Sequence, residues 1–317
     1  MSCATKIKHE SPDCTADRGL QVFYDDTKKS YTGYCFSCAA RGKEAYVKDP
    51  LNGYEAKDLP KGKTKAEIEA EVAEVRALGP PSFTHRSIPP EMFKKTRVRL
   101  ALSEYDGATP FRLNFPMSLN GKLLGFKTIM LDKKAMWSTG GTKGADLFNW
   151  EVAKKAGSKR LYITEGEFDC LALQYMLERS YKAGYAVCSV PTGASGAAQV
   201  IGRMASEINS LFQEVVLVFD NDDAGRNAVK EVQKVLPGVL EAPSVTGIKD
   251  ANEALQKGQQ DNFVDFVKWK ARKPLREGVV TVSQAMDRGL EAPEVGKSLP
   301  WPKTSKVLYG KRGGEAT

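Results

Sequence analysis

The sequence has 317 residues, 41% of them hydrophobic and 27% charged, a composition typical of a folded protein with about two domains. This composition excludes a chain that is disordered throughout, and no apolar run approaches the roughly 18 residues needed to cross a bilayer. Lysine and arginine (47) exceed aspartate and glutamate (39), so the net charge of +8 favours polyanionic partners but identifies none.

The first 40 residues combine a short hairpin with a cluster of cysteines. Alternating apolar residues predict strands at 20–24 and 30–34, joined by a turn at 25–29. The first ten residues contain no hydrophobic signal core, so we expect a protein that is not exported and that keeps its thiols reduced. Four of the six cysteines lie in this region: Cys3, Cys14, Cys35 and Cys38.

A metal site explains these cysteines better than disulfides do. Cys35 and Cys38 form a Cys-x-x-Cys pair, a spacing that binds one tetrahedral zinc ion from a tight turn. His9 and Cys14 complete a set of four, with Cys3 as the competing fourth ligand. Four protein ligands leave no open position for a catalytic water, so we expect one structural Zn²⁺.

The middle of the chain predicts a tether, a helix and a small antiparallel sheet. Residues 40–63 are polar and rich in lysine, glycine and proline, which is typical of a flexible linker. Thr64 and Glu67 form a capping box that begins a helix, which ends before Gly79. Strands are predicted in three segments: 97–102, 111–117 and, after an Asn-Gly turn, 122–131.

The pattern then changes to buried strands that alternate with helices. Apolar runs at 161–164, 185–190 and 215–219 predict strands, and helices are expected to follow the first and third, ending near Leu177 and Leu236. Alternation of this kind predicts a parallel sheet covered on both faces. Beyond 274 the sequence predicts only a weaker helix at 283–290.

Acidic residues follow two of the predicted parallel strands. Glu165 comes directly after the first strand, and Asp169 lies one helical turn later. Asp220 and Asp222 follow the third strand with the two-residue spacing that turns both to the same side. Carboxylates this close repel one another unless cations hold them, and hard oxygen ligands select Mg²⁺ or Mn²⁺.

Three simpler explanations of these acids remain. The spacing around Asp220 contains part of a calcium-binding EF-hand loop, but a strand precedes it and Ala224 occupies the fifth position. A haloacid-type phosphatase also ends a strand in Asp-x-Asp, but it would leave Glu165 and the zinc site without a role. Asp223 is expected to cap the following helix rather than bind metal.

Two motifs together resemble the TOPRIM signature of primases, type IA and II topoisomerases and some nucleases. These are Thr-Glu-Gly-Glu-Phe-Asp at 164–169 and Phe-Asp-Asn-Asp-Asp-Ala-Gly-Arg at 219–226. Lys-Asp-Ala-Asn-Glu at 249–253, with the stretch 137–148, resembles the primase half of phage bifunctional primase-helicases. The resemblance covers about 9–290. The end of the chain is similar to the entrance of that family's helicase domain, but no phosphate-binding loop is present, so no helicase activity is expected.

The resemblance implies an α/β fold, α+β overall. It consists of a small zinc-ribbon β domain and a primase core with a mixed α+β N-terminal subdomain and a TOPRIM parallel-sheet subdomain. The implied divisions are a zinc-binding domain at 1–45, a flexible linker at 46–63, the N-terminal subdomain at 64–158, the TOPRIM subdomain at 159–272 and a linker toward a helicase at 273–317.

The resemblance also assigns roles to individual residues. Glu165 corresponds to the catalytic carboxylate, while Asp220 and Asp222 correspond to the metal-binding pair. Asp169 and Asp250 complete the acidic edge. The residues expected to hold nucleotide phosphates or the template are Lys127, either Lys133 or Lys134, Arg86, Arg112 and Tyr34.

The zinc ligands depart from the family's pattern. The family usually has a second Cys-x-x-Cys pair early in the zinc unit, and Ser11 stands where its first cysteine would fall. We therefore expect His9 to be the replacement ligand, and the choice between His9 and Cys3 stays open.

The implied activity is synthesis of short RNA primers on single-stranded DNA from ribonucleoside triphosphates, with Mg²⁺ or Mn²⁺. Expected partners are the template, a fused replicative helicase and a replicative DNA polymerase, in the cytoplasm of a bacterial host and with no membrane. Two other classes would use the same features: a TOPRIM nuclease, and a non-catalytic module that binds single strands.

Overall fold

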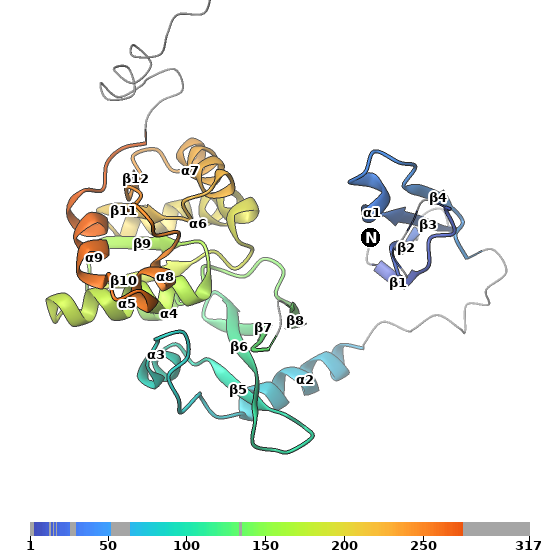
Figure 1. Cartoon of the computed structure of the whole chain (residues 1–317), viewed down its shortest axis with the longest axis horizontal. Helices are drawn as coiled ribbons and strands as arrows, with labels where there is room; N and C mark the ends of the chain where they lie inside the picture. Colours follow the sequence, from blue (N-terminus) through green and yellow to red (C-terminus); the bar gives the residue numbers. More distant parts are fainter. Residues whose placement is uncertain are drawn as a thin grey trace, which may run out of the picture. The chain divides into compact units, whose positions relative to one another are not determined.

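The computed structural model describes residues 3–12, 14, 16, 18–25, 30–51, 64–132 and 135–274 (Figure 1). The expected tether from 52 to 63, the weak helix at 283–290 and the C-terminal linker lie outside these residues. The predicted domain boundaries stay predictions. Within the part described, no helix is both long and apolar enough to span a bilayer.

The chain divides into two compact units. One contains the described residues of Met1–Gly79, Arg99–Asn114 and Leu124–Thr142, and the other contains those of Pro80–Val98, Phe115–Leu123 and Lys143–Thr317. The cysteine cluster, Arg112 and Lys127 belong to the first unit. The acidic residues and Arg86 belong to the second.

The N-terminal region forms an antiparallel sheet with strand order β1-β2-β3-β4. Its elements are β1 (Cys3–Ile7), β2 (Leu20–Asp25), β3 (Ser30–Cys35), the short helix α1 (Phe36–Ala39) and β4 (Tyr46–Lys48). The predicted hairpin corresponds to β2 and β3, whereas β1 and β4 escaped prediction. β4 pairs with β3 inside the range expected to be linker, so ordered structure extends to at least Lys48.

A second antiparallel sheet has strand order β5-β6-β7-β8. It is preceded by α2 (Lys65–Ala77) and α3 (Pro90–Lys95), and its strands are β5 (Arg99–Leu102), β6 (Pro110–Leu119), β7 (Lys122–Met130) and β8 (Met136–Gly140). The capping box is present: the Thr64 side chain accepts from the Glu67 amide, and the Glu67 carboxylate accepts from the Thr64 amide. Asn120 and Gly121 both have positive φ, as a tight hairpin turn requires.

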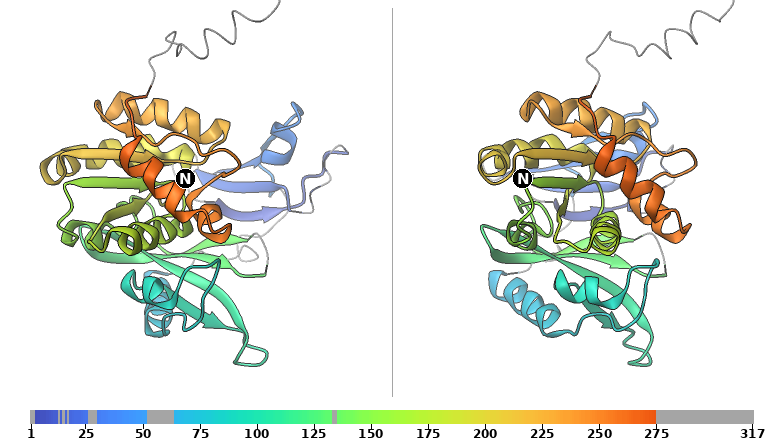
Figure 2. Two further views of the ribbon diagram at one scale, coloured as in Figure 1. Left: turned by 60° about the vertical axis from the view of Figure 1, so that its left-hand side comes forward. Right: turned by 90° about the vertical axis from the view of Figure 1, so that its left-hand side faces the viewer.

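The third sheet is parallel, with strand order β10-β9-β11-β12. Its strands are β9 (Arg160–Thr164), β10 (Ala186–Ser189), β11 (Glu214–Val218) and β12 (Leu240–Glu241). Its helices are α4 (Trp150–Lys155), α5 (Glu167–Tyr181), α6 (Ala197–Leu211), α7 (Asp223–Val235), α8 (Ala251–Gln256) and α9 (Gln260–Trp269), with a short 3₁₀ turn η2 (Ala194–Gly196). Figure 2 shows helices on both faces of this sheet, so the expected fold class is confirmed.

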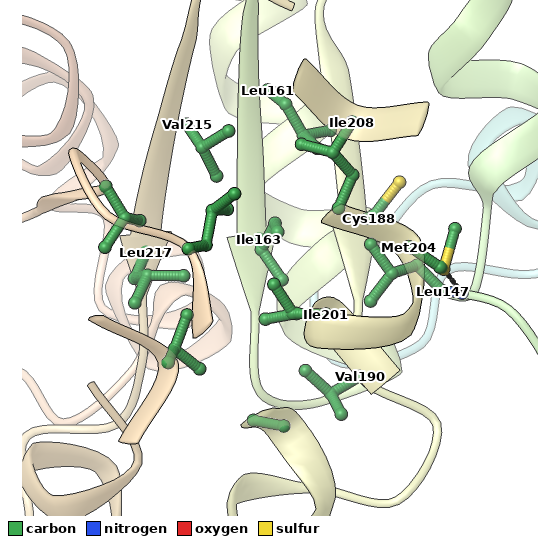
Figure 3. Close-up of a cluster of buried hydrophobic side chains, with 14 of the residues drawn as sticks. Leu147, Leu161, Ile163, Cys188, Val190, Ile201, Met204, Ile208, Val215 and Leu217 are labelled. Atoms are coloured by element: carbon green, nitrogen blue, oxygen red, sulfur yellow. Dashed lines mark hydrogen bonds between the residues drawn. The ribbon is translucent and has the colours of Figure 1, made fainter. Parts of the chain in front are cut away.

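One continuous apolar core stabilises the parallel sheet (Figure 3). Alternate residues of the strands point into it, among them Leu161 and Ile163 of β9 and Leu217 of β11. Ile201 of α6 packs against them, and all four side chains are fully buried. Truncation of such a residue to alanine costs about 2–5 kcal/mol of unfolding free energy, so the sheet does not depend on a bound ion for its stability.

Candidate active site and metal centre

His9, Cys14, Cys35 and Cys38 come together, as the sequence predicted. One ligand atom from each lies within 4.8 Å of all the others. His9 Nδ1 is 3.3 Å from Cys38 Sγ, and Cys14 Sγ is 3.7 Å from Cys35 Sγ. Cys35 ends β3 and Cys38 lies in α1, so the Cys-x-x-Cys pair spans a strand-to-helix turn. Three thiols and one imidazole are a donor set that can hold a single tetrahedral metal ion.

The electrostatics of this cluster favour a bound cation. Burial, followed by hydrogen bonds from Cys14 and Cys35, raises the pKa of Cys38 to about 11. The Ala16 amide, by contrast, lowers the pKa of Cys14. A thiol whose deprotonation is opposed by its neighbours ionises readily only beside a positive charge, and a metal ion supplies that charge.

Gly19 is a residue at this cluster that sequence reasoning missed. A Cβ atom on Gly19 would lie 2.9 Å from Ala16 Cβ and 3.1 Å from Cys35 Sγ, so a larger residue would displace a thiol. No local signal marks this glycine, because the close approach arises only after the strands pair. The side chain of Cys3, the competing ligand, lies outside the described residues.

The carboxyl ends of β9 and β11 place the acidic residues at one edge of the parallel sheet. Thr164, the last residue of β9, pairs with Val218 of β11, so Glu165 and Asp220 leave the sheet at the same level. Asp169 lies in the first turn of α5. Asp250 caps α8, and its Oδ1 accepts from the Glu253 amide at 2.7 Å.

Lys249 lies among these carboxylates. Its Nζ is 2.7 Å from Asp220 Oδ2 and 3.8 Å from Asp222 Oδ2. The Lys249 carbonyl also accepts from the Asn221 amide at 2.9 Å, which ties the two acidic loops together. Lys249 was noted in the sequence only as part of a motif, and its position is a finding of the structure.

Burial and mutual repulsion raise the pKa of three carboxyls. Burial is the largest cause for Glu165, followed by the charge of Asp220. Burial also leads for Asp169, whose pKa lies well above its ordinary value because the Asp250 carboxyl is beside it. The pKa of Asp220 is raised by burial, although Lys249 opposes the shift. The edge therefore carries a charge that the folded protein holds at a cost.

One oxygen of this edge is unsatisfied. Glu165 Oε2 is buried and has no hydrogen-bond partner among the described residues. A buried carboxylate oxygen without a donor is destabilising, and a cation ligand would satisfy it. The orphaned oxygen and the neighbouring hard donors fit a divalent ion such as Mg²⁺ or Mn²⁺.

Two glycines allow the close approach of the acids. A Cβ on Gly225 would lie 2.2 Å from the Asp220 carbonyl oxygen, and a Cβ on Gly166 would lie 2.8 Å from Asp169 Oδ2. Both glycines belong to the motifs recognised in the sequence. Their role is to leave room for a loop that folds back and for a carboxylate.

The expectation that Asp223 caps α7 is wrong. Asp222 is the N-cap, and its Oδ1 accepts from the Gly225 amide at 2.9 Å. Asp223 is the first helical residue, where its exposed side chain pairs with Arg226 at 2.8 Å. Asp222 has the extended backbone that a cap requires, so one of its oxygens serves the helix and the other faces Lys249.

Arg86 lies next to the acidic edge within the second unit. Its guanidinium carbon is 4.4 Å from the centre of the Phe168 ring, and its φ of 49° is in the left-handed region. Asn252 fixes this loop, because its Nδ2 donates to the Arg86 carbonyl at 2.9 Å while its amide donates to Asp169 Oδ1 at 3.0 Å. Asn252 is a buried positioning residue that sequence reasoning missed.

The other expected nucleotide-binding residues belong to the first unit or are not described. Arg112 lies in β6 with its guanidinium 6.0 Å from the Trp137 ring, and its Nε is buried without a hydrogen-bond partner among the described residues. Lys127 lies in β7. The ring of Tyr34 contacts that of Phe36 edge-on at 4.8 Å. Lys133 and Lys134 lie outside the described residues.

Known proteins share the sequence and fold of this site. The Toprim-like family model matches residues 162–255, which hold all five carboxylates. The DNA helicase/primase of Enterobacteria phage T3 is 33% identical over 173 residues, which are 55% of this chain and 29% of that relative. The chain is a homologue of phage primase-helicases. It spans less than a third of the length of the T3 protein, which its Toprim-like domain resembles only in part.

Two solved structures extend the comparison. One shows bacteriophage T7 lagging-strand DNA polymerase interacting with primase domains bound to an RNA/DNA hybrid and dTTP. A chain of that structure is 30% identical, with a TM-score of 0.52, over 62% of this chain and 94% of its own. The primase fragment of the T7 primase-helicase covers 84% of this chain and is itself covered fully, with 24% identity and a TM-score of 0.53. The second likeness concerns the fold alone.

Proposed function

We propose that this chain is a DNA primase. It would be a nucleotidyltransferase that makes short RNA primers on single-stranded DNA from ribonucleoside triphosphates during phage DNA replication. The observation that carries the proposal is the acidic edge of the Toprim-like domain, where Glu165 Oε2 is buried without a hydrogen-bond partner among the described residues. Homology to a phage helicase/primase supports the same activity.

In the proposed reaction, a 3′-hydroxyl attacks the α-phosphorus of a ribonucleoside triphosphate and pyrophosphate leaves. Asp220, Asp222 and Asp250 would hold the catalytic Mg²⁺ or Mn²⁺ together with Glu165. When bound, such an ion acidifies a hydroxyl and offsets phosphate charge. Burial raises the pKa of Glu165, so this carboxylate is suited to accept the proton of the attacking hydroxyl. Asp169 would complete the catalytic edge, held by the Asn252 amide.

Basic residues would hold the substrates. Lys127 and either Lys133 or Lys134 are proposed to bind the triphosphate, because lysine is a compact point charge with three donors. Arg86 and Arg112 are proposed to contact nucleotide or template phosphates. The Arg86 guanidinium is already stacked on Phe168, so little side-chain freedom would be lost on binding.

The N-terminal cluster would have a structural task. His9, Cys14, Cys35 and Cys38 are proposed to hold one Zn²⁺, and the unit around them would present the template to the core. Tyr34 is proposed to stack on a template base, an interaction worth about 1–3 kcal/mol. The proposed partners are the template, a helicase fused in a longer chain and a replicative DNA polymerase, in the cytoplasm of a bacterial host.

A primer-synthesis assay tests the proposal. We expect wild-type chain with ribonucleotides, Mn²⁺ or Mg²⁺ and a library of template trinucleotides to produce short RNA, and Asp220→Asn to abolish it. The absence of RNA from every template would contradict the proposal. Nicking of supercoiled DNA without nucleotides, lost in Glu165→Gln, would indicate a nuclease. Salt-sensitive strand binding that survives all acidic substitutions, without RNA synthesis, would indicate a binding module.

A further inference from the structure

The ammonium group of Lys249 occupies the position where a cation would serve two acids. It contacts Oδ2 of both Asp220 and Asp222, at 2.7 and 3.8 Å. The Asp220 side chain is only 15% exposed, whereas Lys249 is 53% exposed. A half-exposed lysine therefore closes the solvent side of a largely buried carboxylate.

The backbone of Lys249 is fixed while its side chain is not. Its carbonyl accepts from Asn221, and its amide donates to the Glu253 carboxylate at 2.5 Å. These two bonds hold the main chain between the β11 loop and α8. The four-carbon stem reaches into solvent, so the ammonium can leave the carboxylates without any change in the backbone.

A lysine and a metal ion cannot use the same carboxylate oxygen in the same way. An ammonium 2.7 Å from Asp220 Oδ2 occupies space next to the oxygen that an Mg²⁺ ligand must present at about 2.0–2.1 Å. The two positive charges would also repel each other at close range. Binding of a divalent ion at Asp220 and Asp222 therefore requires Lys249 to move away.

We propose that Lys249 is a built-in counter-cation that competes with the divalent ion for Asp220 and Asp222. In the ion-free protein it offsets the repulsion at the edge and keeps the two loops in place. It yields when the ion binds, which raises the ion concentration needed for occupancy. The inference rests on the proposed metal-dependent function of this edge.

Direct measurement of Mn²⁺ binding tests this competition without any assay of activity. The full chain would be titrated with Mn²⁺ at constant ionic strength, with free Mn²⁺ followed by electron paramagnetic resonance and Asp220→Asn as the background. We expect Lys249→Met to bind Mn²⁺ about tenfold more tightly than wild type, because a like charge has been removed from the site. Lys249→Arg, which keeps the charge, should stay closer to wild type than to Lys249→Met.

Lys257→Met is the matched control. Lys257 lies just after α8 and pairs with Glu253 at 2.9 Å, so its loss changes the net charge equally but outside the acidic edge. We expect its Mn²⁺ affinity to stay within about twofold of wild type, as for a screened surface charge. A gain equal to that of Lys249→Met would overturn the proposal, since the effect would then be one of overall charge.

The remaining outcomes separate the inference from the proposed function. Equal or weaker Mn²⁺ binding by Lys249→Met, with wild type binding well, would overturn the role of Lys249 alone. If neither wild type nor Lys249→Met binds Mn²⁺ above the background, the metal-dependent function fails. If Lys249→Met and Lys249→Gln both fail to fold with Mn²⁺ present, Lys249 is a structural residue and the competition model is wrong.

Discussion

The cysteine cluster and the acidic edge place their ligand residues on very different foundations. Around the cysteines, the buried core consists of Leu20, Cys35 and Cys38, so the ligands are themselves the core. The acids instead follow the strands of a sheet whose core extends over α4, α6 and α7. The difference indicates which ion would hold the fold and which would serve chemistry. A metal at the first site would stabilise folding, and a metal at the second would act on substrates.

The two sites also differ in how they tolerate an empty state. Neutral thiols can keep their protons, and burial raises the pKa of Cys38 to about 11. Asp220 and Asp222 instead share an ammonium from Lys249. The acidic edge thus has an internal substitute for part of the cation charge, whereas the described cysteine cluster relies on protons.

Loss of a cysteine ligand should have the largest effect. We expect Cys38→Ser to lose zinc and to unfold the strands β1 to β4, since structural zinc contributes about 10 kcal/mol or more in small domains. The parallel sheet should keep its unfolding temperature, because it has its own core. Metal analysis and amide hydrogen exchange measure the two effects.

Cys3→Ser and His9→Ala test the ligand set at the same time. Cys3→Ser should retain zinc and His9→Ala should lose most of it. The reverse result would show that Cys3 is the fourth ligand. Unfolding of both units together in Cys38→Ser would contradict the contrast between the two sites.

Substitution at the acidic edge should remove activity without loss of fold. We expect Asp222→Asn to reduce primer synthesis by roughly 10²–10³-fold, the scale found when a group that stabilises transition-state charge is removed. Asp223→Asn is the control, because its exposed side chain pairs only with Arg226 among the contacts described here. Equal losses in the two variants would show that the effect is not specific to the edge.

A smaller effect is expected at Asn252. Asn252→Ala removes the hydrogen bond to the Arg86 carbonyl, and we expect KM for ribonucleotides to rise by about three- to tenfold, equivalent to one net hydrogen bond. The kcat value should change less, since the Asn252 amide still donates to Asp169. Gln256→Ala, which removes only the support of Asn252 Oδ1, should have a weaker effect. A change confined to kcat would contradict a role in positioning Arg86.

The smallest effect concerns the pH dependence of stability. The pKa values of Glu165, Asp169 and Asp220 are raised by burial and by neighbouring acids. Their contribution is therefore fully present below the ordinary values of 4.5 and 3.8 and is lost as pH rises through the raised ones. Without added divalent ion, the parallel-sheet unit should melt at lower temperature at pH 7 than at pH 5.

Asp169→Asn should reduce that slope and raise the unfolding temperature at pH 7, by about 2–4 °C for each kcal/mol gained. Scanning calorimetry from pH 4.5 to 7.5 measures both. Added Mn²⁺ should flatten the wild-type slope in the same way. A slope unchanged in Asp169→Asn would show that repulsion at this edge does not limit stability.

Local patterns predicted the features that depend on neighbours in the sequence. The Thr64 capping box, the hairpin at β2 and β3 and the Asn120-Gly121 turn all follow from residues a few positions apart. Helices α6, α8 and α9 escaped prediction, and the cap of α7 was assigned one residue too late. At that turn two adjacent aspartates are equally good caps, and only the backbone angle of Asp222 decides between them.

The sequence by itself determined the ligand types, the order of strands and helices, and the motifs that imply the fold. Residue chemistry and short-range periodicity are local properties, so no tertiary contact is needed to read them. The tertiary structure alone decided that Lys249 faces Asp220, that Asn252 joins Asp169 to Arg86, and that Glu165 keeps an oxygen without a donor. These contacts join segments far apart in the chain, and their distances depend on how the strands and helices pack.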